Sequence, residues 1–319
     1  MKPNMKQVFR RAKKNPLISV HDLPFPAAAV LNPGAAEHDG QTVLLLRVED
    51  RTGRSSIYVA RSKDGVTGWD INPDPFLRCG QDKWRYERWG CEDARVTYVP
   101  EQEQYYVTYT AYSPMGAAVA LARTREFERA ERVGLIFSPS NKDAVLFPKQ
   151  FDGRWAVLHR PDAGGIEHIW SAFSPDLEHW GEPRCVVPEM GGPAWDGLKV
   201  GAGPPPILTD DGWLLIYHGV KEYGGRLVYR AGVALLDKEK PYKVVARCRN
   251  WVFQAEAPYE ISGLVGNIVF PTGLLRRGDE LWMYYGASDS SACLATAKLK
   301  DVLAGMEEET AAKRNNRST

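Results

Sequence analysis

The sequence predicts an all-β protein, specifically a five-bladed β-propeller with short terminal helices. One pattern recurs five times: an apolar first strand, a turn with glycine or acidic residues, an apolar and aromatic strand, a polar loop, and a third strand that ends in small residues. A two-sheet sandwich would fit the number of strands but not this period, so the propeller is favoured. Matching alanines near the third strands lie 50 to 63 residues apart, at Ala60, Ala122, Ala172, Ala234 and Ala297.

The five repeats follow one another without a low-complexity linker, so we expect one domain over residues 1–319. The first repeat spans residues 28–62, with a turn at His38-Asp39-Gly40 before the strands TVLLLRV and SIYVARS. The others span 93–124 (turn PEQEQ, strands YYVTYTAY and AAVALART), 143–174 (turn FDG, strands RWAVLHR and HIWSAFS), 203–236 (turn DDG, strands WLLIYHG and VYRAGVALL) and 267–298 (turn RGD, strands LWMYYGAS and ACLATAK).

The two ends of the chain lie outside the repeats. Residues 3–14 form a basic, weakly amphipathic segment, and residues 298–312 (KLKDVLAGMEEETAA) have the composition of a helix. We expect both ends to be helical and to pack against the body or against a neighbouring subunit of a homo-oligomer.

Composition excludes several classes of protein. The chain has 41 basic and 40 acidic residues, which argues against a nucleic-acid or membrane-surface partner. Its five cysteines are widely spaced and form no CxxC pair, so neither a disulfide framework nor a zinc site is expected. The basic N-terminus lacks the apolar core of a signal peptide, and no run approaches 18 apolar residues. The expected location is the cytoplasm.

The segment from Trp89 to Arg95 carries two adjacent carboxylates just before a β-rich run. If this segment is a strand, Asp93 and Arg95 point to one face and Glu92 and Ala94 to the other. A single acid aimed at a ligand suits a reaction that needs one protein carboxyl group. The alternative is a solvated Glu-Asp pair at the start of a strand.

Several cationic or polar residues fall near the ends of strands that would converge at the mouth of a propeller channel. Each one alone could be a solvated or structural residue. Together they predict an anion site, because converging cations would repel one another unless a ligand charge neutralised them. Phosphate, with about 1.5 to 2 negative charges near neutrality, suits such a set. The residues are Lys142, Arg160, Lys199, His218 and Tyr229.

Other catalytic motifs are absent from the sequence. It contains no GxGxxG after a strand, no Walker loop, no HExxH and no GxSxG. His159 and His168 do not have metal-ligand spacing for a β-protein, so no metal is expected. An inverting glycosidase needs an acid and a second carboxylate that activates water, whereas phosphate is already an anionic nucleophile. One acid beside a phosphate site therefore indicates phosphorolysis of a glycosidic bond.

Eight segments in order along the chain match one known family: VLNPGA (30–35), LLLRVEDR (44–51), CEDARVTY (91–98), NKDAVLFP (141–148), LHRP (158–161), LKVGAGPPPI (198–207), YHGV (217–220) and YYGASDS (284–290). Through them the sequence resembles the mannoside phosphorylases of glycoside hydrolase family 130 over nearly its whole length. This resemblance implies a five-bladed propeller, agreeing with the repeats. It also implies that the protein cleaves a terminal β-mannosidic bond of an oligosaccharide with inorganic phosphate, giving α-mannose 1-phosphate, with no cofactor besides this co-substrate.

The resemblance also assigns roles to residues. Asp93 is implied to be the general acid, acting through a hydroxyl of the bound mannose. Many relatives carry arginine where Lys142 stands, which changes a planar fork into a point charge. The phosphate-binding positions of the family are matched by Lys142, Arg160, Lys199, His218 and Tyr229. The positions that hold the sugar are matched by Asn32, Arg47, His168 and Asp289.

Three questions stay open at this level. Arg95 would lower the pKa of Asp93, whereas a general acid needs a raised one, so Arg95 must turn to a partner such as Glu92 or bound mannose must raise the pKa. A β-mannosidase that uses water and a non-catalytic sugar-binding propeller are the alternative functions. The linkage and the acceptor sugar depend on loops such as 81–90 and 221–226.

Overall fold

The structure is a computed structural model that describes residues 7–304 and 306, and it confirms the all-β class. Strands make up most of the described chain. The short helical elements are η1 (Val20–Asp22), η2 (Arg85–Glu87), η3 (Pro100–Gln102), α1 (Pro258–Ile261) and a C-terminal helix at residues 299–304 and 306. No helix in the described part of the chain is long and apolar enough to cross a membrane.

The largest sheet has eight strands in two antiparallel groups. A parallel bridge between Ser55 and Gly90 joins the two groups. The strand order is β2 (Ala29–His38), β3 (Gln41–Glu49), β4 (Ser55–Ser62), β6 (Gly90–Val99), β7 (Gln104–Ser113), β8 (Gly116–Thr124) and β9 (Glu131–Phe137), with β5 (Asp70–Ile71) paired to β4.

Three further sheets complete the described chain. The first is β10 (Asn141–Phe151), β11 (Arg154–Pro161), β12 (Ile169–Ser174) and β13 (Gly181–Val187). The second is β14 (Lys199–Ala202), β16 (Gly212–Tyr223), β17 (Arg226–Leu236) and β18 (Val244–Arg247), with β15 (Ile207–Thr209) on β16 and β19 (Phe253–Gln254) on β17. The third is β1 (Arg10–Arg11), β22 (Ser291–Lys298), β21 (Glu280–Ala287) and β20 (Val269–Arg277).

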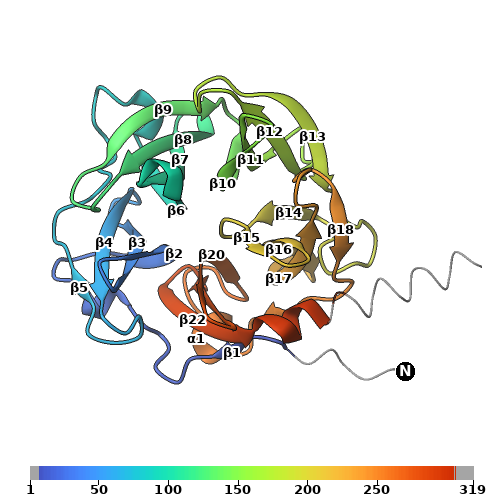
Figure 1. Ribbon diagram of the computed structural model, residues 1–319. Helices are drawn as coiled ribbons and strands as arrows, with labels where there is room; N and C mark the ends of the chain where they lie inside the picture. The colour runs from blue at the N-terminus through green and yellow to red at the C-terminus, as the bar shows by residue number, and fades with distance from the viewer. Residues whose placement is uncertain (1–6, 305, 307–319) are drawn as a thin grey trace, which may run out of the picture.

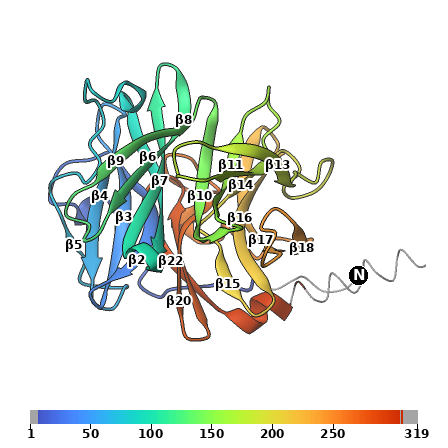
Figure 2. The same cartoon turned by 45° about the horizontal axis from the view of Figure 1, so that its top comes forward.

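The sheets stand around a common centre, with β2, β6, β10, β15 and β20 nearest to it (Figures 1 and 2). Apolar clusters fill the spaces between neighbouring groups of strands, so most strands bury both faces. The run Leu44-Leu45-Leu46 in β3 illustrates the consequence. Leu44 and Leu46 pack with Tyr284 of β21, while Leu45 packs with Val107 of β7. Strand alternation thus explains an apolar run with no polar face.

The predicted N-terminal helix over residues 3–14 is wrong for its described part. Residues 7–14 contain β1, which pairs with β22 through Arg10 and Thr296. Arg11 lies 2.7 Å from the carboxylate of Glu260, which is fully buried, so the segment is tied to the sheet instead of forming a solvated helix. The predicted C-terminal helix is confirmed at residues 299–304 and 306. Residues 3–6 and 307–312 of these two predictions lie outside the described residues.

Three of the central strands, β2, β6 and β10, carry a β-bulge near the start of the strand. At each bulge one residue has a left-handed backbone: Asn32 (φ 46°), Asp93 (φ 51°) and Asp143 (φ 54°). Asn and Asp tolerate this conformation better than most residues with a Cβ atom, and a bulge redirects the side chain it carries. All three side chains line one pocket at the centre of the molecule.

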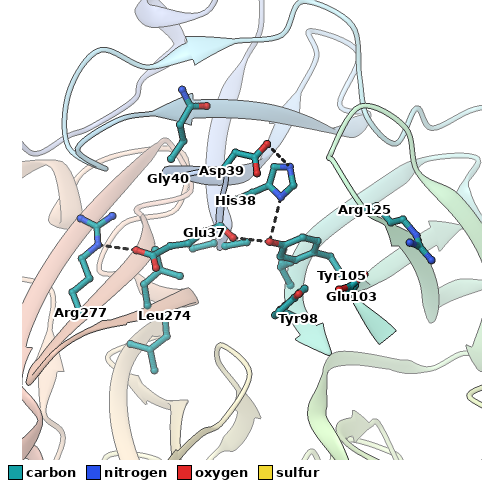
Figure 3. A pocket seen from close by; sticks show the side chains of 15 residues that line it. Glu37, His38, Asp39, Gly40, Tyr98, Glu103, Tyr105, Arg125, Leu274 and Arg277 are labelled. Atoms are coloured by element: carbon teal, nitrogen blue, oxygen red, sulfur yellow. Dashed lines mark hydrogen bonds and ion pairs between the residues drawn. The ribbon is translucent and has the colours of Figure 1, made fainter. Parts of the chain in front are cut away.

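Two hollows lie toward opposite ends of these central strands. The pocket of Asn32, Asp93 and Asp143 has a volume of about 150 Å³. The other hollow, of about 880 Å³, lies where β2 and β6 end, and it is lined by His38, Tyr98 and their neighbours (Figure 3).

Candidate active site

The small central pocket collects most of the residues that the sequence singled out. Eight of the ten predicted site residues line it: Asn32, Arg47, Asp93, Lys142, Arg160, Lys199, Tyr229 and Asp289. Asp143, Ile268 and Phe270 complete the lining. These residues come from β2, β3, β6, β10, β11, β14, β17 and β20 and from two loops, so the site exists only when all the sheets are assembled.

Asp93 is held from two sides at the centre of the pocket. The side-chain amide of Asn32 donates a hydrogen bond of 2.8 Å to Oδ1 of Asp93, and Arg47 donates to the same oxygen at 3.2 Å. Asn32 in turn lies against Gly286, where a Cβ atom would collide with the Asn32 amide. The orientation of the Asp93 carboxylate is therefore fixed by side chains from β2 and β3.

Glu92 and Asp93 share one partner, which the alternation of a regular strand does not allow. Arg47 contacts Oε1 of Glu92 at 3.1 Å with its second Nη atom. The expectation that Glu92 and Asp93 serve opposite faces is thus wrong, because the bulge in β6 interrupts the alternation. Arg47 therefore links both acids.

Arg95 turns to another partner, which is one of the two possibilities that the sequence left open, but this partner is Asp143 and not Glu92. Its side chain is buried and pairs with Asp143 at 3.0 Å, and it also donates to the main-chain carbonyl of Asp93 at 2.7 Å. It forms no hydrogen bond to the carboxylate of Asp93 or of Glu92 within the described chain. Arg95 holds the backbone of the bulge and leaves the Asp93 carboxylate to face the pocket.

The pKa values of Asp93 and Asp289 are shifted in opposite directions. Burial opposes ionisation of Asp93, but Arg47, Arg95 and the Asn32 amide outweigh it and hold the pKa of Asp93 below its usual value. Burial and the negative charge of Asp93 raise the pKa of Asp289 to about 6, with Arg47 offsetting only part of the rise. In the ligand-free pocket at neutral pH, Asp93 is a carboxylate.

Asp143 organises the opposite side of the pocket. Its fully buried carboxylate lies 3.0 Å from Arg95, 2.9 Å from Arg160 and 3.5 Å from His218. Burial opposes its ionisation, but Arg160 and Arg95 hold the pKa of Asp143 well below its usual range. Gly201 makes this packing possible, since a Cβ atom there would collide with both His218 and Asp143.

His218 does not add a positive charge to the site. Burial, with smaller contributions from Arg160 and Arg95, lowers the pKa of His218 to about 3 against the opposing pull of Asp143. Its Nε2 atom lies 3.1 Å from Arg160, and a guanidinium can only donate, so we assign the ring proton to Nδ1. The predicted cationic role of His218 is corrected to that of a neutral residue that contacts Arg160.

A second carboxylate, Glu167, bridges two of the predicted phosphate-binding cations. It lies 3.0 Å from Nε of Arg160 and 3.3 Å from Nζ of Lys199. The premise that only a ligand charge neutralises these cations is therefore wrong, because Asp143 and Glu167 supply counter-charges. Four cations still face these two carboxylates, which leaves an excess of positive charge: Lys142, Arg95, Arg160 and Lys199.

Two aromatic side chains form a wall beside the cations. Phe270 of β20 lies 4.5 Å from the ring of His218 and 5.7 Å below the guanidinium of Arg95. Tyr229 of β17 lies 6.2 Å from Phe270, and burial raises the pKa of its hydroxyl. Tyr229 is therefore a neutral hydrogen-bonding group at neutral pH.

His168 is the predicted sugar-binding residue that the structure does not bring into the pocket lining. Its imidazole forms an ion pair with Glu189, and its Nδ1 atom lies 3.7 Å from Sγ of Cys185. The neighbouring Glu167 side chain reaches the pocket cations instead.

Sequence reasoning did not identify Asp143, Glu167 or Phe270. A signal for Asp143 existed, because Asp143 begins its repeat as Asp93 does and has the same bulged position in the next group of strands. Glu167 lies in a loop and Phe270 in an apolar run, and no local pattern distinguishes either one. No cluster of three or more His, Cys, Asp or Glu residues suited to a metal ion occurs between residues 7 and 304 or at 306.

The sequence is similar to known proteins over most of its length. A family profile described as beta-1,4-mannooligosaccharide phosphorylase (glycoside hydrolase family 130) matches residues 3–308. A beta-1,2-mannobiose phosphorylase from Listeria innocua is 33% identical, with 94% of this chain and 98% of the relative covered. A beta-1,4-mannooligosaccharide phosphorylase from Ruminococcus albus is 32% identical, covering 93% and 90% of the two chains.

The fold also matches a solved structure. The beta-1,2-mannobiose phosphorylase from Listeria innocua, in complex with beta-1,2-mannobiose, superposes with a TM-score of 0.84. The two chains are 32% identical, and the match covers 94% of this chain and 99% of the other.

Proposed function

Because the chain belongs to glycoside hydrolase family 130, we propose that it is an inverting phosphorylase of β-mannosides. It would cleave a terminal β-mannosidic bond with inorganic phosphate and release α-mannose 1-phosphate and a shortened acceptor. One observation carries this proposal: the carboxylate of Asp93 lines the same small pocket as three cations, Lys142, Arg160 and Lys199.

In this mechanism a phosphate oxygen forms a bond to the anomeric carbon while the bond from that carbon to the glycosidic oxygen breaks. Attack from the face opposite the leaving group converts the β-linkage into the α-phosphate. Asp93 supplies the proton that the leaving oxygen needs, through a hydroxyl of the bound mannose as the family resemblance implies. In the synthetic direction the Asp93 carboxylate takes this proton back from the acceptor hydroxyl.

Phosphate would bind on the side of the pocket formed by β10, β11 and β14. Lys142, Arg160 and Lys199 supply charge and N–H donors, and the neutral Tyr229 hydroxyl supplies a further donor. His218 and Asp143 would act through Arg160 by fixing its guanidinium. Phosphate then needs no activating carboxylate, since it is itself the nucleophile.

Substrate binding must change the protonation of Asp93 for phosphorolysis. The ligand-free pocket holds the pKa of Asp93 below its usual value, which suits its role as a base in synthesis. A phosphate dianion across the pocket and the displacement of water by a sugar ring both favour the protonated acid. We therefore propose that Asp93 takes up its proton as the ternary complex forms.

Asn32, Arg47 and Asp289 are the residues we propose for holding the mannose ring. They surround Asp93 and offer an amide, a guanidinium and a carboxyl group to sugar hydroxyls. His168 is proposed for the same sugar subsite on the family resemblance alone, and to reach it the imidazole would have to leave Glu189.

The proposal extends to architecture and setting. We propose a single domain of five propeller blades, supported by five apolar clusters that join each group of strands to the next and the last group to the first. A cytoplasmic homo-oligomer is proposed as well. Exposed apolar side chains at Ile261, Leu264 and Val265 favour a subunit contact, which light scattering in solution would test.

Product analysis with and without phosphate tests the proposed reaction. The protein is incubated with β-1,2- and β-1,4-mannobiose, and the products are identified by NMR. Formation of α-mannose 1-phosphate that requires phosphate supports the proposal. Undiminished release of free mannose without phosphate would indicate a hydrolase, and binding without turnover would indicate a sugar-binding protein. Synthesis from α-mannose 1-phosphate with a panel of acceptors would then identify the linkage and the acceptor.

A further inference from the structure

Glu167 is the feature of the pocket that the proposed reaction does not use. Its carboxylate lies between Arg160 and Lys199, at 3.0 and 3.3 Å, and these are two of the groups proposed to bind phosphate. Both cations line the pocket, whereas Glu167 reaches them from the loop between β11 and β12. An anion that enters the pocket therefore meets donors that already have an anionic partner.

Asp143 and Glu167, the two carboxylates paired with these cations, differ in how easily each can separate from them. Asp143 is fully buried on a strand and has three charged or polar partners at once. The Glu167 side chain is 17% exposed and follows Gly164 and Gly165, which have left-handed backbones with φ of 70° and 91°. The Asp143 carboxylate is a fixed part of the site, and the Glu167 carboxylate can exchange into solvent.

We propose that Glu167 is an internal competitor of phosphate, which sets the affinity of the site for phosphate through Arg160 and Lys199. In the ligand-free protein it neutralises these two cations, and an entering phosphate replaces it on them. When the product dissociates, the Glu167 carboxylate returns to the two cations. This lowers the free energy of the ligand-free pocket. This inference rests on the proposed function, because it presumes that the pocket binds phosphate.

The test compares Glu167→Gln with wild type by isothermal titration with inorganic phosphate and by the KM for phosphate in phosphorolysis. We expect the phosphate Kd to fall about tenfold in the variant, the size expected when one negative charge a few Å from the ligand is removed. Glu182→Gln is the matched control, since it removes the same charge from β13 of the same sheet, where Glu182 pairs with the exposed Arg154. Its phosphate Kd should equal that of wild type.

A second variant separates competition from a structural role. In a Lys199→Met background Glu167 has lost one of its two partners, so Glu167→Gln should tighten phosphate binding less than it does in wild type. Glu167→Asp keeps the charge on a shorter side chain, and it should bind phosphate more weakly than Glu167→Gln even if Glu167→Gln is less stable in thermal unfolding.

The outcomes distinguish the two proposals. If wild type binds phosphate and Glu167→Gln binds it no more tightly, the role of Glu167 is overturned and the phosphorylase proposal stands. If Glu167→Gln tightens binding equally with and without Lys199, competition for Lys199 is overturned. If wild type neither binds phosphate nor requires it for turnover, the phosphorylase proposal itself fails.

Discussion

The two hollows at opposite ends of the central strands differ in how they treat charge. The larger one, of about 880 Å³, carries exposed groups that pair with near neighbours: Glu37, with a side chain 53% exposed, contacts Arg277, and Asp39 is 89% exposed (Figure 3). The smaller one, of about 150 Å³, encloses Asp93, whose side chain is 10% exposed, and Asp143, which is fully buried.

This difference shows that burial, more than size, identifies the site. A charge near water is screened, so changing it has little effect on its neighbours. In and directly behind the small pocket, burial and close partners move the pKa of Asp289 to about 6 and that of His218, which contacts Arg160, to about 3. Groups whose ionisation depends so strongly on their neighbours respond to an arriving sugar or anion, which is what catalysis requires.

Asp93→Asn gives the largest expected effect and tests most directly whether the small pocket is the active site. The proton donor is lost, so kcat should fall by about 10² to 10⁴ in both phosphorolysis and synthesis. Asn accepts the left-handed backbone at this position, so folding should be retained. The measurement is the initial rate in each direction, with thermal unfolding as the check on folding.

Asp39→Asn is its matched control from the larger hollow. Asp39 also has a left-handed backbone, with φ of 48°, and the substitution removes the same charge. Activity should be unchanged. Equal losses in the two variants would show that the pocket of Asp93 has no special role.

Asp143→Asn should give the largest loss of stability. Arg95 and Arg160 would lose a carboxylate they share, and removing one partner of a buried ion pair costs about 3 to 5 kcal/mol. Urea unfolding measures this free energy, and the KM for phosphate should rise because Arg160 is no longer fixed. Glu37→Gln, which removes an exposed partner of Arg277, should cost at most about 1 kcal/mol. A cost for Asp143→Asn as small as that for Glu37→Gln would contradict the role given to Asp143.

The sequence predicted the all-β class and individual strands because the repeats are local patterns. The expected strand TVLLLRV, at residues 42–48, lies within the observed β3 (Gln41–Glu49), and the alternation of Leu44, Leu45 and Leu46 between two clusters follows from strand geometry alone. Eight of the ten predicted site residues line one pocket for a related reason, since most follow the same positions in successive repeats or match family segments.

What the sequence could not predict depends on long-range packing. The bulge at Asp93 breaks strand alternation, so Glu92 contacts Arg47 and Arg95 turns to Asp143, 48 residues away in the chain. The neutral state of His218 results from complete burial beside two guanidinium groups, and its own sequence neighbours give no sign of this. Charge balance in the pocket can be counted only when the sheets are assembled.

Asp289→Asn gives the smallest expected effect, and its signature is a dependence on pH. The pKa of Asp289 is about 6 in the folded protein against an ordinary value of 3.8, so the folded state binds this proton more tightly than the unfolded state does. Below about pH 3 the carboxyl is protonated in both states and does not affect the free energy of unfolding. As pH rises from about 4 to about 6, ionisation increasingly favours the unfolded state, and the cost levels off above pH 6.

Removing this carboxyl should therefore stabilise the protein more at the higher pH. The rise in pKa from 3.8 to about 6 corresponds to at most about 3 kcal/mol. In urea unfolding, Asp289→Asn should be more stable than wild type by about 1 kcal/mol at pH 4.5 and by about 3 kcal/mol at pH 7.5. Asp39→Asn, run in parallel, measures the effect of losing a carboxylate from the exposed hollow. A difference between wild type and Asp289→Asn that is constant with pH would mean that burial beside Asp93 does not control this carboxyl, and the contrast between the two hollows would lose its electrostatic basis.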